Sequence, residues 1–352
     1  MDKKKYGRRL LNLILASLII FMAVTGCGTS DVGNNSDGSG YGVTQVSTGE
    51  SSASGDITIG IAWRADPDSE FYTNIAATLD DIGARYVMLN QVVTGDIPYE
   101  SGNVASECID DNDVLKQEYA DVIKSNTYNN SNAEKVMDGI NAVIFTGGED
   151  IAPTLLKEPA SWHGIQEEKD YNATRDVNDY ILMSYCLDKD IPIMGFCRGM
   201  QMLGTVSGAT FIQDIPEYFR AAGIEYNYLH RNNKISPDAY RDYAPHDVNI
   251  TDSDSVLYQI VGSDVLKSVP SWHHQALLSV DGTKLKVTGT TDTNGISMIE
   301  SIQRTDKKFA VGFQFHPEAA VVKNLNNADN AGKFMDRQTA ENFFIMLIKA
   351  AR

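Results

Sequence analysis

Ile191-Pro-Ile-Met-Gly-Phe-Cys-Arg-Gly-Met-Gln-Met-Leu203 is the stretch of this 352-residue sequence that decides its fold. The first half is a short apolar run that predicts a buried strand, and the second half continues as a helix. Cys197 lies at the turn between them, two residues after Gly195 and two before Gly199. A turn this sharp needs glycines there, because neighbouring segments of backbone approach closely. The stretch therefore predicts a strand, a tight turn and a helix.

The same turn makes Cys197 a candidate nucleophile. The residue would lie at the amino end of a helix, where the helix dipole and free amide groups favour a thiolate. The alternative interpretation is a small cysteine buried in a core strand, because free cysteine is among the most buried residue types. The two flanking glycines favour the nucleophile.

Strands and helices alternate along the rest of the chain. Apolar runs predict strands, and apolar residues spaced three or four apart predict helices. This alternation predicts an α/β fold, in which helices cover both faces of a mostly parallel central sheet and the site lies at the carboxyl ends of the strands. A small antiparallel addition is expected near the carboxyl end. The predicted strands are 56–63, 86–89, 142–145, 209–212, 284–287, 295–302 and 309–315, and the predicted helices are 70–82, 114–123 and 175–187.

The amino-terminal residues have the pattern of an export signal. Five basic residues precede an apolar segment from Leu10 to Val24, which is short for a membrane-spanning helix. Val24-Thr-Gly-Cys27 resembles the lipobox of bacterial lipoproteins, which implies cleavage before Cys27 and a lipid on its sulfur. The alternative is an uncleaved anchor helix. We expect an exported protein that is lipid-anchored at the outer face of the bacterial cytoplasmic membrane, or on the periplasmic side where an outer membrane exists.

A tether is expected between this signal and the folded domain. Residues 27–55 are rich in Gly, Ser, Asp, Asn and Thr and have almost nothing to bury, whereas the domain is expected at 56–352. Loss of residues 1–26 removes five positive charges and one negative charge, which changes the net charge from −17 to about −21. An acidic surface of this kind argues against a nucleic-acid partner.

Two polar segments, 90–133 and 216–245, are expected to be surface insertions that border the site. Three cysteines remain after lipidation of Cys27. Export would permit a disulfide between Cys108 and Cys186, but no feature of the sequence requires it.

Three further motifs carry possible chemistry. The glycine pair in Thr146-Gly-Gly-Glu-Asp150 follows a predicted strand and would let backbone amides approach a ligand. In Ser271-Trp-His-His-Gln275, adjacent histidines would point in opposite directions on a strand, which disfavours a shared metal ion and favours substrate contact or structural hydrogen bonds. His316-Pro-Glu318 follows the last predicted strand, and extended backbone would place its imidazole and carboxylate on the same side. A carboxylate in that place stabilises the imidazolium that a cysteine's base partner becomes.

Gly195-Phe-Cys-Arg-Gly-Met-Gln201 together with Gln314-Phe-His-Pro-Glu318 resembles the class I glutamine amidotransferase-like superfamily, a flavodoxin-like fold. The nearer resemblance is to its γ-glutamyl hydrolase branch, which includes the hydrolases of γ-glutamyl-γ-aminobutyrate. It covers roughly residues 57–352 and is supported by Gly147-Gly148, Arg175-Asp176 and the 273–275 motif. Two departures concern the substrate: Glu149 follows the glycine pair, and residues 151–156 lack the tyrosine common in that loop.

The resemblance implies a role for each matching residue. Cys197 would be the nucleophile, His316 its base and Glu318 the group that orients the imidazole. The amides of Gly148 and Arg198 would form the oxyanion hole. No metal ion or organic cofactor is implied. The residues expected to contact the glutamyl group of a small γ-glutamyl substrate are Gln201, His273, His274 and Gln275.

The sequence leaves several functions open. Glutamine amidotransferases pass ammonia to a synthetase, and we expect neither a synthetase domain nor a synthetase subunit for an exported chain, so hydrolysis of a γ-glutamyl amide is the preferred prediction. One alternative is an exported lipoprotein that binds γ-glutamyl compounds or amino acids without turnover. Another is an amidase that acts on γ-linked glutamate in cell-wall peptides.

Overall fold

The fold is seen in a computed structural model, which describes residues 57–158, 162–164, 166–234 and 241–352. The predicted signal sequence, the tether and Cys27 lie outside these ranges, as does part of the 216–245 segment. No helix in the described ranges is long and apolar enough to cross a bilayer.

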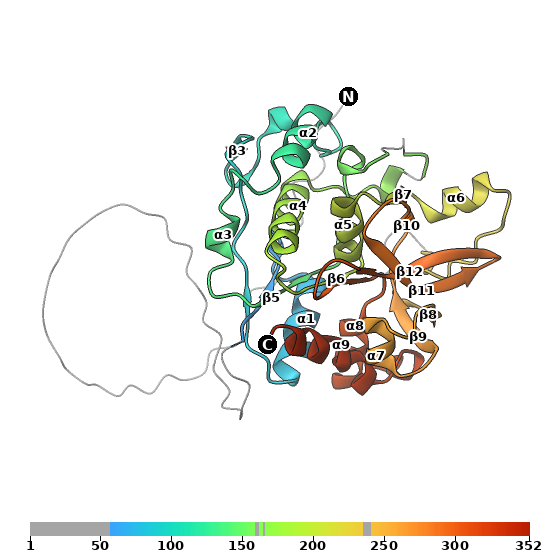
Figure 1. Ribbon diagram of the computed structural model, residues 1–352. Coiled ribbons are helices and arrows are strands. Elements are labelled where there is room, and N and C mark those ends of the chain that lie inside the picture. The colour runs from blue at the N-terminus through green and yellow to red at the C-terminus, as the bar shows by residue number, and fades with distance from the viewer. Residues whose placement is uncertain (1–56, 159–161, 165, 235–240) are drawn as a thin grey trace, which may run out of the picture. The chain divides into compact units, whose positions relative to one another are not determined.

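One sheet of nine strands organises the domain, and its two halves differ (Figure 1). Five parallel strands come first, in the spatial order β2-β1-β5-β6-β13, and four antiparallel strands continue the sheet as β12-β11-β8-β9. The predicted α/β fold is therefore confirmed, and its antiparallel addition extends the central sheet itself. The parallel strands are β2 (Tyr86–Met88), β1 (Ile59–Ile61), β5 (Ala142–Phe145), β6 (Ile193–Phe196) and β13 (Ala310–Phe313). The antiparallel strands are β12 (Ile296–Arg304), β11 (Leu285–Thr293), β8 (Ala244–Ile250) and β9 (Val265–Ser271).

Helices cover both faces of this sheet (Figure 1). The side chains of β5 alternate between two apolar cores, because successive residues of a strand point to opposite faces: Val143 and Phe145 join one core, and Ala142 and Ile144 join the other. The first core packs under α4 (Ala173–Asp188) and α5 (Arg198–Ser207), near α2 (Gln117–Asn126) and α3 (Ala133–Val136). The second packs against α1 (Glu70–Asp81), α7 (Val256–Val261), α8 (Pro317–Leu325) and α9 (Arg337–Ala350).

Small elements complete the domain. The predicted strand at 209–212 is found as β7 (Thr210–Ile212), which pairs with β10 (Ala276–Ser279) in a separate antiparallel pair. Another antiparallel pair joins β3 (Tyr99–Glu100) to β4 (Asn103–Val104), and α6 (Ile215–Ala221) begins the 216–245 segment.

The sequence predicts that segment 90–133 is a surface insertion, but the structure shows that it is partly buried. Its apolar residues are too far apart to form an obvious strand, yet many of them are buried in the core that α4 also lines. Asn178 on α4 accepts a hydrogen bond from the amide of Val92 at 2.7 Å, and Thr174 accepts one from Val104 at 2.9 Å. The segment is therefore an integral cover of α4. Its buried apolar residues are Val92, Ile97, Val104, Ala105, Cys108, Leu115, Ala120, Ile123 and Ala133.

Candidate active site

Cys197 lies at the carboxyl end of β6, at the first residue before α5. Its backbone has φ +51° and ψ −105°, a conformation that residues other than glycine rarely adopt. The Cys197 amide donates a hydrogen bond to the carbonyl of Phe313 on β13 at 2.7 Å, which ties the turn to the neighbouring strand. The strained, anchored turn is the one that the sequence predicts.

The two glycines of the turn are required by close approaches of backbone. A Cβ atom on Gly195 would lie 2.4 Å from the carbonyl carbon of Gly199, and a Cβ on Gly199 would lie 2.3 Å from the carbonyl oxygen of Phe145. Neither neighbour is a flexible side chain, so any larger residue would displace the start of α5 from the sheet. The glycines at these two positions therefore allow α5 to pack closely against β5 and β6.

His316 and Glu318 lie beside this turn, because β13 is the parallel neighbour of β6. The imidazole Nδ1 of His316 lies 2.7 Å from Oε1 of Glu318, and both side chains are fully buried. The local backbone differs from the extended form expected from the sequence: α8 begins at Pro317, so Glu318 lies in its first turn. Proline is favoured at the first helical position because its φ is already suitable and its missing N–H has no partner there.

Electrostatics favour a charged imidazole. Burial by itself lowers the pKa of His316, but the Glu318 carboxylate and Cys197 outweigh this effect and raise the pKa to about 10. Nδ1 faces Glu318, and a side-chain hydrogen bond with Cys197 also contributes to the raised pKa of His316. Nε2 is therefore the nitrogen available to exchange a proton with Cys197, whose Sγ lies 3.8 Å from the carbonyl oxygen of Trp272.

Two backbone amides are available near Cys197. Those of Gly148 and Arg198, the predicted oxyanion hole, have no acceptor in the part of the chain that the structure describes. The Gly147 carbonyl accepts hydrogen bonds from Nη1 of Arg64 at 2.6 Å and from Nη2 of Arg175 at 2.8 Å. The carbonyl and amide of a trans peptide point in opposite directions, so the two arginines fix the direction of the Gly148 amide. Gly148 has φ +139°, and a Cβ there would lie 2.0 Å from Arg175 Nη1.

Next to the turn lies a group of five charged side chains, here called the arginine cluster. Four of them are buried and Glu149 is partly exposed; its members are Arg175, Arg198, Glu149, Asp176 and Asp179. Arg198 pairs with Asp176 at 2.5 Å and also with Asp179. Arg175 pairs with Glu149, and its Nε lies 3.5 Å from Asp179. Burial raises the pKa of Asp176 to about 6, whereas Arg175 and the other arginines outweigh burial at Glu149 and hold its pKa at about 2.

The four predicted substrate-binding residues lie near the turn, but protein atoms hold most of their polar groups. Gln201 donates to the carbonyl of Gln275 at 3.0 Å, and the Gln275 side chain bonds to Ile151 and Gln213. Nε2 of His274 lies 2.9 Å from Asp150, and its Nδ1 lies 3.0 Å from Asp214. His273 belongs to a separate group of buried histidines. Their contact with substrate stays a prediction.

Sequence reasoning missed three side chains at the site. The Phe71 ring lies 5.3 Å from the His316 ring on one side, and the Tyr243 ring lies 5.3 Å from it on another. Arg64 follows β1 and holds the Gly147 carbonyl. The position of Arg64 just after a strand could have identified it, because carboxyl ends of parallel strands meet at one edge. Nothing local marks Phe71 or Tyr243.

Cys108, Cys186 and Cys197 are all buried free thiols, so Cys108 and Cys186 are not linked. Burial raises the pKa of the Cys108 and Cys186 thiols, which disfavours their reactive thiolate forms. Of the described cysteines, Cys197 alone lies at a strand-to-helix turn beside an imidazole.

The fold and the site together define an α/β protein of the glutamine amidotransferase-like class, with Cys, His and Glu at the carboxyl edge of the parallel strands. Comparison with known proteins agrees. The model of the family Peptidase C26 matches residues 114–318, which include Cys197, His316 and Glu318. The chain belongs to the Peptidase C26 family.

Curated relatives are similar over half or more of the chain. Protein NtpR of Enterococcus hirae is 32% identical over 202 residues, which are 57% of this chain and 75% of that protein. A glutamine amidotransferase-like protein of Rickettsia prowazekii is 27% identical over 54% of this chain and 75% of its own length. The γ-glutamyl-γ-aminobutyrate hydrolase PuuD of Escherichia coli K12 is 26% identical over 51% of this chain and 76% of its own.

Proposed function

We propose that this protein hydrolyses a γ-glutamyl amide bond through a γ-glutamyl thioester on Cys197. The observation that carries the proposal is the position of Cys197 at a strained turn at the end of β6, beside the paired His316 and Glu318 at the end of the adjacent β13. Membership in Peptidase C26 supports a hydrolase, and similarity to a γ-glutamyl-γ-aminobutyrate hydrolase supports the γ-glutamyl group.

Acylation would begin with transfer of the Cys197 proton to Nε2 of His316. The raised pKa of His316 favours the resulting pair of thiolate and imidazolium. The thiolate attacks the γ-carbonyl carbon, and the amides of Gly148 and Arg198 donate to the oxyanion, a contribution of about 3 to 4 kcal/mol per donor in comparable sites. The imidazolium gives its proton to the amine as the C–N bond breaks. The thioester remains on Cys197.

Deacylation would reverse the proton transfers with water in place of the amine. His316 takes a proton from water, the hydroxide attacks the thioester carbonyl, and the sulfur leaves as glutamate is released. Glu318 holds the imidazole in one orientation through both halves of the cycle. His316 therefore accepts and donates every proton that the proposed cycle transfers.

The lipid anchor belongs to the same proposal. An exported, membrane-tethered hydrolase would meet γ-glutamyl compounds outside the cytoplasm, where the lipobox-like segment ending at Cys27 would place it. We propose a small γ-glutamyl amide as substrate, because the formal net charge of −17 disfavours a long polyanionic glutamate chain.

The test is intact-protein mass spectrometry after rapid acid quench of the full chain mixed with a panel of γ-glutamyl amides. We expect a mass increase of one glutamyl group on the native protein, release of amine and glutamate, and glutamyl hydroxamate when hydroxylamine is added. The matched control is Cys186→Ala, which removes a thiol outside the site and should still form the adduct, whereas Cys197→Ala should not.

Other outcomes would contradict the proposal. Saturable binding of the amides without adduct or amine would indicate a binding lipoprotein. Release of amine only from cell-wall peptides that contain γ-linked glutamate would indicate the cell-wall amidase. An adduct on Cys197→Ala would exclude this cysteine as the nucleophile.

A further inference from the structure

A second group of titratable side chains lies in the antiparallel half of the sheet. It consists of His230 in the loop after α6, His246 on β8, His273 just after β9, and Glu300 on β12, and is here called the histidine cluster. All four side chains are buried, and one potential ligand atom from each lies within 4.8 Å of the others. The proposed hydrolysis uses none of them.

The potential ligand atoms of this cluster face one another, and none of them makes a well-aligned hydrogen bond, although His230 Nδ1 and Glu300 Oε1 are only 3.0 Å apart. Nδ1 of His230, Nε2 of His246, Nε2 of His273 and both carboxylate oxygens of Glu300 are buried and lack a hydrogen-bond partner among the described residues. A buried acceptor without a partner costs about 1 to 3 kcal/mol. Five such atoms in one place therefore need an explanation, because buried polar atoms in folded proteins are normally satisfied.

The outer nitrogens of the rings determine where the lone pairs point. His246 Nδ1 lies 3.2 Å from the Asp247 carbonyl, and His273 Nδ1 lies 2.9 Å from the Gln275 carbonyl. A carbonyl only accepts, so both Nδ1 atoms carry hydrogen and both Nε2 atoms present a lone pair to the centre. His230 has the opposite arrangement: Nε2 lies 2.7 Å from the Thr293 hydroxyl, and Nδ1 points inward. Because a hydroxyl can accept as well as donate, Nε2 can carry the hydrogen and leave a lone pair on Nδ1. Metal-bound histidines are held in this way by outer hydrogen bonds.

The spacing fits a tetrahedral ion. Glu300 Oε1 lies 3.0 Å from His230 Nδ1 and 3.8 Å from His273 Nε2, and Oε2 lies 3.8 Å from His246 Nε2. Zinc binds such atoms at about 2.0 to 2.2 Å in a tetrahedron, which separates the ligand atoms by about 3.3 Å. The ligand atoms all lie within 4.8 Å of one another, so the longest separations would have to shorten by as much as about 1.5 Å when an ion is bound.

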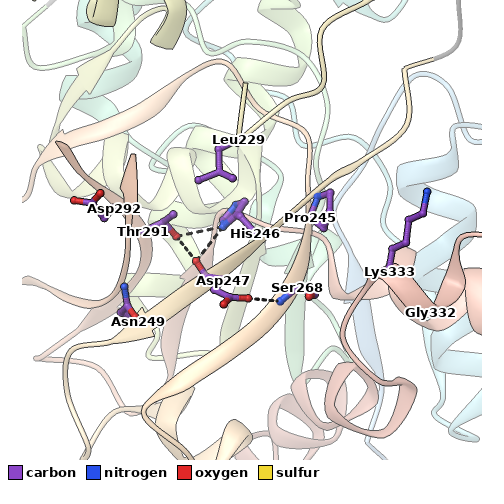
Figure 2. A pocket seen from close by; sticks show the side chains of 10 residues that line it. All are labelled: Leu229, Pro245, His246, Asp247, Asn249, Ser268, Thr291, Asp292, Gly332 and Lys333. Carbon is purple, nitrogen blue, oxygen red and sulfur yellow. Dashed lines mark hydrogen bonds between the residues drawn. The ribbon is translucent and has the colours of Figure 1, made fainter. Parts of the chain in front are cut away.

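A hollow on the surface lies beside the cluster. Its volume is about 790 Å³, and both His246 and Thr291 line it. Figure 2 shows the Thr291 hydroxyl next to the His246 ring, and the hydroxyl also donates to the Asp247 carbonyl at 2.7 Å. Asp247 and Asp292 line the hollow together with Lys333, and Asp247 also pairs with Lys267 at 2.7 Å, so positive and negative side chains balance there. Of the four cluster residues, His246 is the one that lines the hollow.

We propose that His230, His246, His273 and Glu300 bind one divalent transition metal ion, with Zn²⁺ as the ion that best fits three imidazoles and one carboxylate. Four protein ligands leave no open position, so the ion is structural. This inference revises the expectation from the sequence that no metal is involved, and it goes beyond the proposed function.

The metal would support the active site from behind. His273 directly follows Trp272, whose carbonyl faces the Cys197 sulfur. The Glu300 carbonyl accepts a hydrogen bond from the Gln314 amide at 2.9 Å, two residues before His316. Bonds from one ion to His273 and Glu300 therefore fix both segments that flank the reacting groups. His273 and Glu300 are positioning residues, because they would act through Trp272 and His316.

Metal content tests this proposal without any substrate. The full chain, produced with zinc in the medium and dialysed, is analysed by plasma mass spectrometry, and we expect about one zinc per chain. Protein stripped with a chelator should regain one equivalent of Co²⁺ and develop the strong visible bands of tetrahedral cobalt. Stripping should lower Tm by about 5 to 10 °C, because a bound ion stabilises only the folded state.

Variants locate the ion. His246→Ala and Glu300→Gln should each reduce retained zinc at least tenfold, and the matched control His163→Ala, which removes an exposed histidine, should retain it fully. Less than one tenth of an equivalent of zinc or cobalt in the native protein would overturn the proposal and leave a shared proton on Glu300 as the explanation. Full zinc retention in both cluster variants would also overturn it. Cobalt titration of the native chain gives the answer even if a variant fails to fold.

Discussion

Two groups of buried titratable side chains lie in the two halves of one sheet, and they are satisfied in different ways. In the arginine cluster next to the Cys197 turn, every charged side chain faces one of opposite sign. In the histidine cluster, by contrast, three ring nitrogens and two carboxylate oxygens face one another and lack hydrogen-bond partners among the described residues. Inside a protein, paired opposite charges compensate for each other's loss of hydration. Acceptors that converge on one point do not, so they need a bound cation or a proton.

The two regions should also differ in what they do. The parallel half carries Cys197, His316 and Glu318, which we propose to be reactive, and the antiparallel half supplies the segments that hold them. Substitutions in the first half should change chemistry or leave charges unpaired. Substitutions in the second should change metal content first. Four predictions sharpen this contrast, from the largest expected effect to the smallest.

Cys197→Ala should have the largest effect on turnover and almost none on stability or metal content. Because the nucleophile is lost, we expect turnover of a γ-glutamyl amide to fall at least about 10⁴-fold, while Tm and zinc content stay close to the native values. Steady-state amine release, thermal unfolding and metal analysis on the same preparation measure all three. A variant that kept more than a hundredth of native turnover would remove Cys197 from the mechanism.

Glu318→Gln should lower turnover about 10²- to 10⁴-fold, because a neutral amide neither stabilises the His316 imidazolium nor fixes its orientation. The loss should lie mainly in kcat, with a smaller change in KM. As a comparison, Glu217→Gln changes an exposed ion pair on α6 and should leave both constants unchanged. Equal turnover in the two variants would contradict the role given to Glu318.

Arg198→Met should lower the free energy of unfolding by about 3 to 5 kcal/mol, because Asp176 and Asp179 would remain buried without their main partner. Arg220→Ala is the matched control: its side chain is 74% exposed and pairs with Glu217, so the loss should be below about 1 kcal/mol. Urea unfolding followed by circular dichroism measures both. Similar losses in the two variants would mean that the arginine cluster does not carry the stability we assign to it.

The smallest expected effect is a pH dependence of stability. The pKa of His316 is raised from 6.5 to about 10 by Glu318 and Cys197 against the effect of burial. The folded state therefore holds this proton more tightly than the unfolded state, so its stabilisation is complete below pH 6.5 and is lost as pH rises through about 10. We expect Tm to fall by a few degrees between pH 7 and pH 10.

The same scan on Glu318→Gln provides the comparison. Without the carboxylate the pKa of His316 should be lower, so this variant should lose less Tm over that interval than the native chain. Parallel curves for the two proteins would show that His316 does not titrate as proposed.

The sequence by itself determined the turn and the type of fold. Gly195, Cys197 and Gly199 are each two positions apart, so the pattern reflects one local crossing of backbone, which the structure confirms. The alternation of strands and helices is also a local property, because hydrophobic period follows from backbone geometry. His316 and Glu318 could be paired from the sequence for the same reason, although the backbone between them is the first turn of α8 and not extended.

Only the tertiary structure decided which distant residues meet. Arg64 reaches Gly147 across 83 positions, and His230 meets Glu300, which lies 70 positions further along the chain. Those contacts depend on the spatial order of strands, in which β12, β11, β8 and β9 do not follow the chain, and no local pattern contains that order. The buried 90–133 segment was misjudged for a related reason: its apolar residues have no regular period, and burial came from packing on α4. Residue types and short spacings can be read from the sequence, but which distant side chains meet depends on how the strands are ordered in the sheet.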